Sequence, residues 1–190
     1  MRRILTHSRL AALVGSAGVM ALVIASPAAA ATSRLPASMR AGKAAAEIRA
    51  EMKAQLRYNP TGKVLGPDRI SYDHGRVIVT VALPGKASPR FTCATGSVCL
   101  FEGTNLTGTH AEISQPISQY IAIKSYLSSA VLSLHNVRTD RVFLNQRTDG
   151  GGGYVCYPAG AITNSIGTPY RNFAALYLAD TNEECPAANP

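Results

Sequence analysis

The sequence lacks the short motifs that mark several large enzyme classes. It contains no HExxH, no G-x-S-x-G and no Walker loop. The glycine run at 150–153 is followed neither by a Lys-Ser or Lys-Thr pair nor by a helical pattern, so we interpret it as a hairpin tip rather than a phosphate-binding loop. We therefore expect no enzymatic activity, no catalytic residue and no cofactor.

Histidine is scarce, and the cysteines are not spaced as metal ligands. Beyond the first 31 residues the histidines are His74, His110 and His135, which we expect in turns or at the surface rather than as catalytic bases. Ser97 has no histidine or acid close to it in the sequence that would make it a nucleophile. Because there is no CxxC and no paired histidine spacing, we predict no metal site.

Only one long apolar run is present, and it lies at the start of the chain. A basic stretch ending at Arg9 precedes the uncharged run 10–24, and Pro27 is followed by the small residues 28–31. This layout predicts a signal peptide at 1–31, cleaved after Ala30 or Ala31. No later run approaches the roughly 18 apolar residues of a membrane span, so we expect a secreted, extracellular protein.

Positive charge is concentrated in one part of the chain. Removing 1–31 takes away three basic residues and no acid, so the net charge falls from +8 to +5. Residues 32–89 carry ten Lys or Arg against four acids, while 90–190 carry six against seven. A nearly neutral C-terminal part argues against a nucleic-acid partner, which needs a concentrated cationic face. We interpret the basic leader as a solvated helix.

The four cysteines are Cys93, Cys99, Cys156 and Cys185. An even number in an exported chain predicts two disulfides, for which three pairings are possible. We favour Cys93 with Cys99 and Cys156 with Cys185, because the first two are six positions apart with a glycine between them to turn the chain. The second bridge then closes a loop of about 30 residues, worth roughly 3 to 4 kcal/mol in the loop-entropy model.

The leader, 32–89, reads as a helix followed by a hairpin. Apolar residues recur every three or four positions, which predicts an amphipathic helix over about 39–57. Asn59, Pro60 and Gly62 end it. Alternating apolar residues around an Asp-His-Gly turn predict a β-hairpin over about 69–83.

The remainder, 90–190, repeats itself. The strand at 97–102 with its glycine-bounded tip is echoed at 141–145, which matches Phe101 with Phe143. A second pair of similar segments, 129–134 and 174–178, matches Ala130 with Ala175. Two copies of a strand-rich unit predict an all-β sandwich of two Greek-key motifs.

One segment resembles the βγ-crystallin Greek-key signature, aromatic-E-x-x-N-aromatic-x-G. It supplies Phe101, Glu102, Asn105 and Gly108, with a leucine at the second aromatic position, and Ser129 stands ahead of a later strand. With its leader and cysteines, the chain is similar to secreted βγ-crystallin-like bacterial proteins grouped with the peptidase inhibitors. The resemblance implies a monomer that blocks an extracellular peptidase, with zinc metallopeptidases as the target class.

The resemblance also implies a reactive site and a metal expectation. The founding inhibitor's reactive bond follows its third cysteine, which corresponds to Cys156 followed by Tyr157. Alternatively, these two residues belong only to a core strand and its disulfide. The family's calcium pattern has Lys124 where a carboxylate or amide should stand, and its second copy, beginning at Arg171, lacks both hydroxyls, so we expect weak calcium binding or none.

Two other functions remain open. One is an extracellular binding module on the same fold, antifungal or wall-binding, whose basic leader helps to hold it to an anionic surface. The other is a structural stress or envelope protein.

Overall fold

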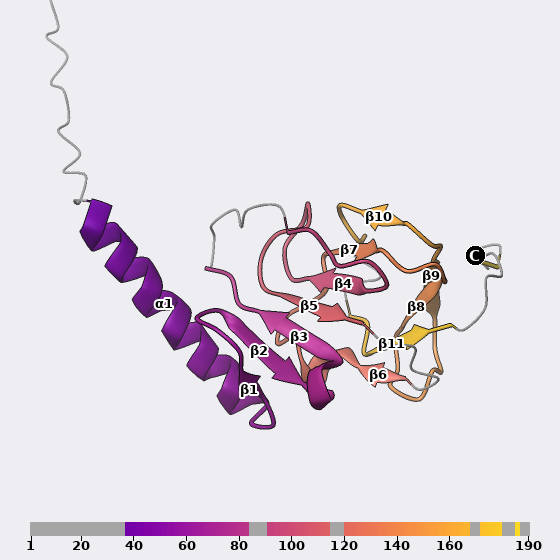
Figure 1. Ribbon diagram of the computed structural model, residues 1–190. Helices are drawn as coiled ribbons and strands as arrows, with labels where there is room; N and C mark the ends of the chain where they lie inside the picture. The colour runs from indigo at the N-terminus through magenta and orange to yellow at the C-terminus, as the bar shows by residue number, and fades with distance from the viewer. Residues whose placement is uncertain (1–36, 84–90, 115–119, 168–171, 180–184, 187–190) are drawn as a thin grey trace, which may run out of the picture. The chain divides into compact units, whose positions relative to one another are not determined.

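One helix and a series of short strands form the secondary structure. The computed structural model describes residues 37–83, 91–114, 120–167, 172–179 and 185–186, and the predicted signal peptide lies outside them. Helix α1 spans Ala37–Tyr58 (Figure 1). The strands that follow are β1 (Lys63–Val64), β2 (Arg69–Tyr72), β3 (Val77–Thr80), β4 (Val98–Phe101), β5 (His110–Ile113), β6 (Ile121–Ala122), β7 (Ser133–Asn136), β8 (Val142–Asn145), β9 (Tyr154–Tyr157), β10 (Ile162–Thr163) and β11 (Ala175–Leu178).

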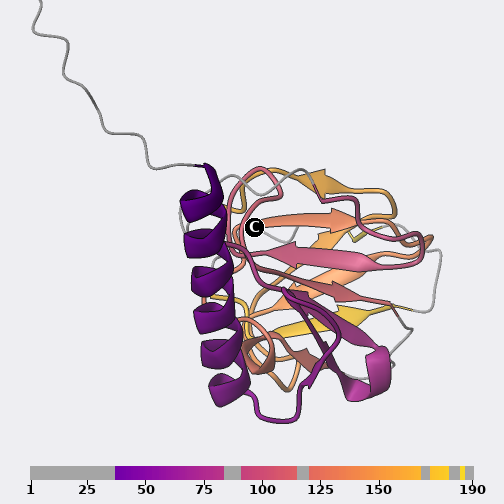
Figure 2. The same cartoon turned by 60° about the vertical axis from the view of Figure 1, so that its left-hand side comes forward.

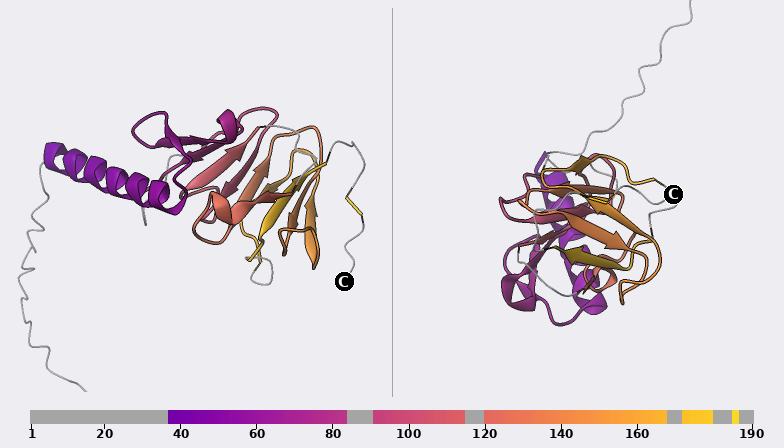
Figure 3. Two further views of the ribbon diagram at one scale, coloured as in Figure 1. Left: turned by 90° about the horizontal axis from the view of Figure 1, so that it is seen from below. Right: turned by 90° about the vertical axis from the view of Figure 1, so that its right-hand side faces the viewer.

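Within the described residues the strands form two antiparallel sheets. Sheet A has the order β1-β2-β3-β5-β4-β7-β10, and sheet B has the order β6-β11-β8-β9. The sheets can be followed from two further directions in Figure 3. No helix among these residues is long and apolar enough to cross a membrane.

The two halves after residue 90 exchange their third strands. The first motif consists of β4, β5, β6 and β7, and the second of β8, β9, β10 and β11. Strand β6 pairs with β11 of the second motif, whereas β10 pairs with β7 of the first. The predicted βγ-crystallin-like sandwich of two Greek keys, preceded by a helix and a hairpin, is therefore confirmed.

The main core lies on the inner faces of both sheets. Side chains alternate along a strand, so every second residue of β4, β7, β8 and β11 points inward. The inner positions include Leu100 and Leu134 of sheet A and Leu144 and Leu176 of sheet B, all fully buried. Both motifs thus contribute to one shared core.

The strand register corrects the alignment of the repeat. Val98 pairs with Ile113 as Val142 pairs with Tyr157, so Phe101 is equivalent to Asn145 rather than to Phe143. In the fourth strands Ser133 is equivalent to Ala175, so the match of that alanine with Ala130 is wrong by three positions. The first mismatch is a shift of two, which keeps each side chain on the same face of the strand, so the apolar alternation alone does not exclude it.

Helix α1 contacts the sheets through its C-terminal half. Met52 is buried in the main core, and Ile48 and Leu56 pack against it. The amide nitrogen of Gln55, also buried, donates to the carbonyl oxygen of Tyr126 at 2.8 Å. Figure 2 shows the helix alongside the strands. This apolar face is the one that the sequence periodicity predicts.

The leader hairpin is part of sheet A. Strand β3 pairs with β5 in an antiparallel ladder of four residue pairs, from Val77 opposite Ile113 to Thr80 opposite His110. Ile70, on β2, is fully buried in the main core. The leader thus extends the same sheet as the first Greek key.

Two disulfides are present in the structure. Cys93 is joined to Cys99, and Cys156 is joined to Cys185. These are the two pairings that the spacing favours.

A second apolar cluster covers the outer face of sheet A. It consists of Cys93, Cys99 and Phe101, with Phe91 packed against them. The ring of His110 lies 3.9 Å from Phe91 between centroids and is only 3% exposed, so the expectation of a turn or surface residue is wrong for this histidine. Burial lowers its pKa from 6.5 to about 4.

We predict that Ile70→Ala destabilises the whole domain by about 2 to 5 kcal/mol, because it leaves a cavity in the shared core. Denaturant unfolding followed by circular dichroism should show one transition at lower denaturant. Val64→Ala, at an exposed position of β1, should change stability by less than about 0.5 kcal/mol. Separate transitions for the hairpin and the remainder would contradict the shared core.

We predict a second effect, on acid stability, from His110. The folded state resists its protonation, so its contribution is complete above pH 6.5 and declines as the pH falls toward about 4. The loss amounts to about 3 kcal/mol at most. His110→Phe should flatten the pH dependence of the melting temperature over this range, and His74→Asn, in the exposed turn, is the control for the loss of a histidine.

Candidate functional site

The signature residues of the first motif fold a hairpin back onto its sheet. Asn105 and Leu106 adopt left-handed φ angles of 57° and 59°, and Gly108 has φ 83°. The hydroxyl of Ser133 donates to the carbonyl oxygen of Gly103 at 2.6 Å and accepts the backbone N–H of Leu106 at 3.0 Å. A fully buried serine on β7 therefore holds the hairpin in place.

Glu102 links this hairpin to the segment that follows β6. Its carboxylate accepts the backbone N–H of Ser129 at 2.7 Å. Burial raises the pKa of this carboxyl, while hydrogen bonds from Ser129 and Ser128 and the nearby charge of Lys124 act in the opposite direction. Ser129 thus holds this hairpin through its backbone N–H, whereas Ser133 holds it through its hydroxyl.

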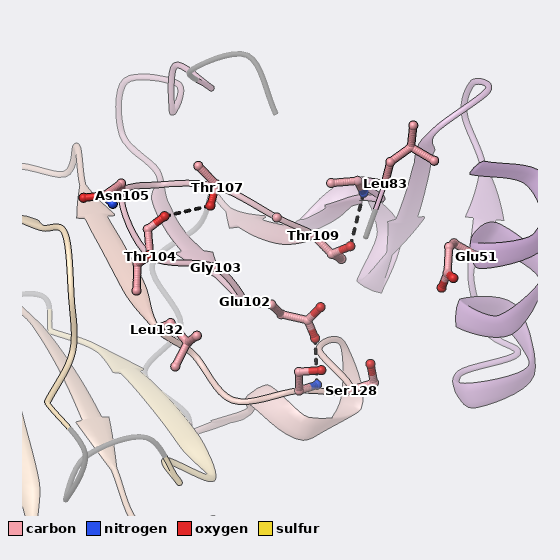
Figure 4. A pocket seen from close by; sticks show the side chains of 13 residues that line it. Glu51, Leu83, Glu102, Gly103, Thr104, Asn105, Thr107, Thr109, Ser128 and Leu132 are labelled. Atoms are coloured by element: carbon pink, nitrogen blue, oxygen red, sulfur yellow. Dashed lines mark hydrogen bonds between the residues drawn. The ribbon is translucent and has the colours of Figure 1, made fainter. Parts of the chain in front are cut away.

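A cavity of about 720 Å³ lies between α1 and this hairpin (Figure 4). The carboxylate of Glu102 lines it from the hairpin, and Glu51 lines it from the helix. Thr109 is also in its wall, where its hydroxyl accepts the backbone N–H of Ala82 at 3.1 Å. Polar and apolar groups line the cavity in similar measure, and two of its polar groups, the Glu102 carboxylate and the Thr109 hydroxyl, already have partners within the protein.

Lys124 stands where the calcium pattern needs an oxygen ligand. Its ammonium nitrogen lies 3.1 Å from the carbonyl oxygen of Ser129, to which it donates. The same lysine's carbonyl oxygen accepts the Tyr58 hydroxyl of α1. A positive charge and a used carbonyl oxygen both disfavour a bound cation at this place.

The sequence-predicted reactive bond lies at the end of an open edge strand. Among the described residues, no strand pairs with the side of β9 that faces away from β8. The N–H of Gln146 donates to the carbonyl oxygen of Gly153, so the hydrogen-bonded pairs of this ladder continue at Val155 and Tyr157. The backbone N–H and C=O groups of Tyr154 and Cys156 therefore point out from the open edge.

The side chain of Tyr157 does not point outward. It is 8% exposed and belongs to the main core. Its carbonyl oxygen lies 3.4 Å from the amide nitrogen of Asn136, which also donates to the carbonyl oxygen of Pro158 at 2.9 Å. In this conformation the Tyr157 ring is not presented to a peptidase pocket, whereas the peptide group of Cys156 is at the surface.

An aromatic row crosses the outer face of sheet B beside this edge. We use this name for Tyr120, Tyr177, Phe143 and Tyr154. Successive ring centroids are 5.1, 6.1 and 5.6 Å apart. The two end residues, Tyr120 and Tyr154, are 43% and 49% exposed. The chain has only twelve aromatic residues, so one third of them gather on this face.

The glycine-rich tip of the second hairpin lies against the row. Gly150 has φ 79°, and a Cβ at this position would overlap the ring of Tyr120. The tip is also ordered by Asp149, whose carboxylate accepts the N–H of Gly151 at 3.0 Å and pairs with Arg147 at 2.6 Å. Glycine is therefore required here by both backbone conformation and contact.

Comparison with protein-family models gives one match, peptidase inhibitor family I36, over residues 86–157. The matched segment, which we call the I36 segment, makes up less than half of the chain. The I36 segment covers the first Greek key and extends through β9, so it ends at the predicted reactive bond. This match supports an inhibitor function with a peptidase as the partner.

Several solved structures are similar to part of the chain. One was solved for work on the evolution of the eye lens βγ-crystallin domain fold; it is 15% identical with a TM-score of 0.42, and the match covers 54% of this chain and 96% of that one. Spherulin 3a from Physarum polycephalum is 13% identical (TM-score 0.39, covering 52% and 96%). The N-terminal domain of protein S is 13% identical (TM-score 0.37, covering 44% and 94%). No curated protein matches the chain.

Some functional groups of the I36 segment could be predicted from the sequence, and others could not. The structure brings Glu102 and Ser129 together, and it puts Cys156 at an open edge. The hydroxyl of Ser133 was missed, although a polar residue inside an apolar strand could have indicated it. The aromatic row was also missed, because its members are brought together only by the pairing of β6, β11, β8 and β9.

We predict that about 1 mM calcium leaves the melting temperature unchanged within about 1 °C, because a site with millimolar affinity or weaker adds little stability. Differential scanning fluorimetry with and without a chelator measures this. Magnesium at the same concentration serves as the control for ionic strength. A calcium affinity in the micromolar range would show that the positive charge of Lys124 does not prevent calcium binding.

Proposed function

We propose that the protein is an exported inhibitor of extracellular zinc metallopeptidases that occupies the target's cleft and is not itself an enzyme. The I36 match over residues 86–157 is the observation that carries the proposal. The predicted signal peptide and the two disulfides support export, because cystines persist in oxidising compartments.

The segment around Cys156 is the proposed reactive segment. Peptidase clefts bind extended chains largely through backbone hydrogen bonds, and strand β9 is extended with the carbonyl group of Cys156 on its open side. In the proposal this carbonyl oxygen approaches the zinc of the target. The ring of Tyr157 stays in the core, so the affinity comes from the backbone and from the outward side chains.

Rigidity is what makes such a segment inhibitory rather than a substrate. A strand already held in its bound shape loses little conformational entropy on docking. Strand β9 is held by the β8 ladder on one side and by the Cys156–Cys185 bridge at its end. If the bond after Cys156 is cut, the core contacts of Tyr157 and the disulfide keep both new ends in position.

We predict that the oxidised protein inhibits a thermolysin-like zinc endopeptidase, with activity falling to a plateau at equimolar inhibitor. The double variant Cys156→Ala/Cys185→Ala should weaken inhibition at least about tenfold. The reason is that the Cys156–Cys185 bridge, worth roughly 3 to 4 kcal/mol in the loop-entropy model, holds the end of β9 in its folded conformation. Residual peptidase activity on a peptide substrate measures both effects.

The matched control is Cys93→Ala/Cys99→Ala, which removes the bridge on sheet A and leaves β9 intact. It should inhibit as the wild-type protein does, and circular dichroism should confirm that both variants are folded. Unchanged peptidase activity at a large molar excess of wild-type protein would refute the proposal.

A further inference from the structure

Equivalent positions in the two Greek-key motifs have different surroundings. The identical register of β4–β5 and β8–β9 makes His110 equivalent to Tyr154 and Glu112 equivalent to Cys156. A shared hydrogen-bond pattern supports this equivalence, because the backbone N–H of Glu102 donates to the carbonyl oxygen of Thr109 as the backbone N–H of Gln146 donates to that of Gly153. The outer edge of β5 in the first motif therefore corresponds to the outer edge of β9 in the second.

In the first motif the chain fills this edge with its own leader. Strand β3 lies antiparallel to β5, with Ile78 opposite Glu112 and Thr80 opposite His110. The N–H of Ser114 donates to the carbonyl oxygen of Arg76, which continues the same ladder. The outer edge of β5 thus pairs with an added strand over its full length.

The outer face of the first motif is filled as well. Phe91 packs on Phe101 and His110, and Cys93 is bonded to Cys99 on the same face. His110 is consequently 3% exposed, whereas the equivalent Tyr154 is 49% exposed. Among the residues that the structure describes, the edge that β3 covers in the first motif is open in the second. On the adjoining face, Cys185 is bonded to Cys156 and Arg141 lies over the ring of Phe143, while Tyr154 stays exposed.

We propose that the open edge of β9 binds an extended strand of its partner in antiparallel pairing, in the register that β3 has on β5. The proposal rests on the proposed function, and the partner strand is the substrate-binding edge strand of the inhibited peptidase's cleft. Its backbone would pair with the N–H and C=O groups of Tyr154 and with the N–H of Cys156, the equivalents of His110 and Glu112, while the carbonyl oxygen of Cys156 is left to approach the zinc.

The aromatic row supplies the side-chain contacts of the same interface. Tyr154 belongs both to the edge and to the row, and Phe143 lies directly opposite Cys156 on β8. Tyrosine and phenylalanine bury large rigid surfaces, and tyrosine is enriched at binding hot spots. A partner strand added at the edge of β9 would therefore place adjoining partner residues over the aromatic row. Strand β3 covers the edge of β5 in the same way.

Amide hydrogen exchange tests the pairing directly. In the free protein we expect the amides of Tyr154 and Cys156 to exchange fast and those of Val155 and Tyr157 slowly. His110 and Glu112 provide the internal control, because their amides face β3 and should be protected without any partner. With the thermolysin-like zinc endopeptidase bound, exchange at Tyr154 and Cys156 should slow at least about tenfold, since each amide gains a hydrogen-bond partner.

A pair of variants distinguishes the contribution of the Tyr154 backbone N–H from that of the Tyr154 ring. Tyr154→Ala removes the ring, whereas Tyr154→Pro removes the ring and also the outward N–H, which is tolerated at an open edge. We expect the proline variant to inhibit about five- to tenfold more weakly than the alanine variant, which corresponds to one lost hydrogen bond. Proton NMR spectra establish that both variants retain the wild-type fold.

The outcomes distinguish this inference from the proposed function. If inhibition occurs but the Tyr154 and Cys156 amides stay fast in the complex, strand addition is wrong and the inhibitor function stands. If no inhibition occurs, both fail. Protection of these amides in the free protein at low concentration would mean that the edge is covered by the chain itself, and protection that grows with concentration would mean that a second copy occupies it. Either result overturns the proposal.

Discussion

The exchange of third strands between the two Greek keys is the constraint on which the rest of the structure depends. Strand β6 completes sheet B, and β10 extends sheet A, so each motif is finished only by a strand from the other. The shared core, with Leu134 on one sheet and Leu176 on the other, follows from this arrangement. The exchange also fixes where β5 and β9 stand, each at the margin of its own motif, and thereby creates two equivalent edges.

These equivalent edges have different surroundings because the chain has only one leader. The hairpin of β2 and β3 is on the N-terminal side of the first motif and reaches β5, and the segment containing Phe91 and Cys93 covers the adjoining face. The second motif is bounded instead by Cys185, which is tied to β9 by a disulfide. A duplicated unit thus becomes asymmetric through what precedes and follows it. The second copy is left with the exposed backbone and aromatic side chains that binding proteins use.

Much of the fold could be predicted from the sequence, because its signals are local. The apolar spacing that ends at Leu56 gives the helix, and the Asp-His-Gly turn gives the hairpin. The repeat was detected from two strands in each half, although Phe101 was matched with Phe143 instead of Asn145. What fixes the register is the pairing across strands, which no single segment carries.

The site was harder to predict for the same reason. A cysteine followed by an aromatic residue gives no indication that Cys156 faces outward while the Tyr157 ring is in the core, since that depends on which pairs of the ladder are hydrogen-bonded. His110 has a polar side chain in a short strand and reads as a surface residue. Its burial results from Phe91, which lies far from it in sequence. The pairing of β3 with β5 is equally non-local and could not be read from the hairpin's own pattern.

The position of β3 in sheet A has a consequence for synthesis. The ribosome makes this strand first, and its acceptor β5 follows roughly 30 residues later, so an apolar strand with an unpaired edge exists before its own partner does. The β5 edge of a neighbouring chain offers the same groups in the same order. Two chains that traded their leaders would therefore use the same pairing of β3 with β5 that the single chain uses.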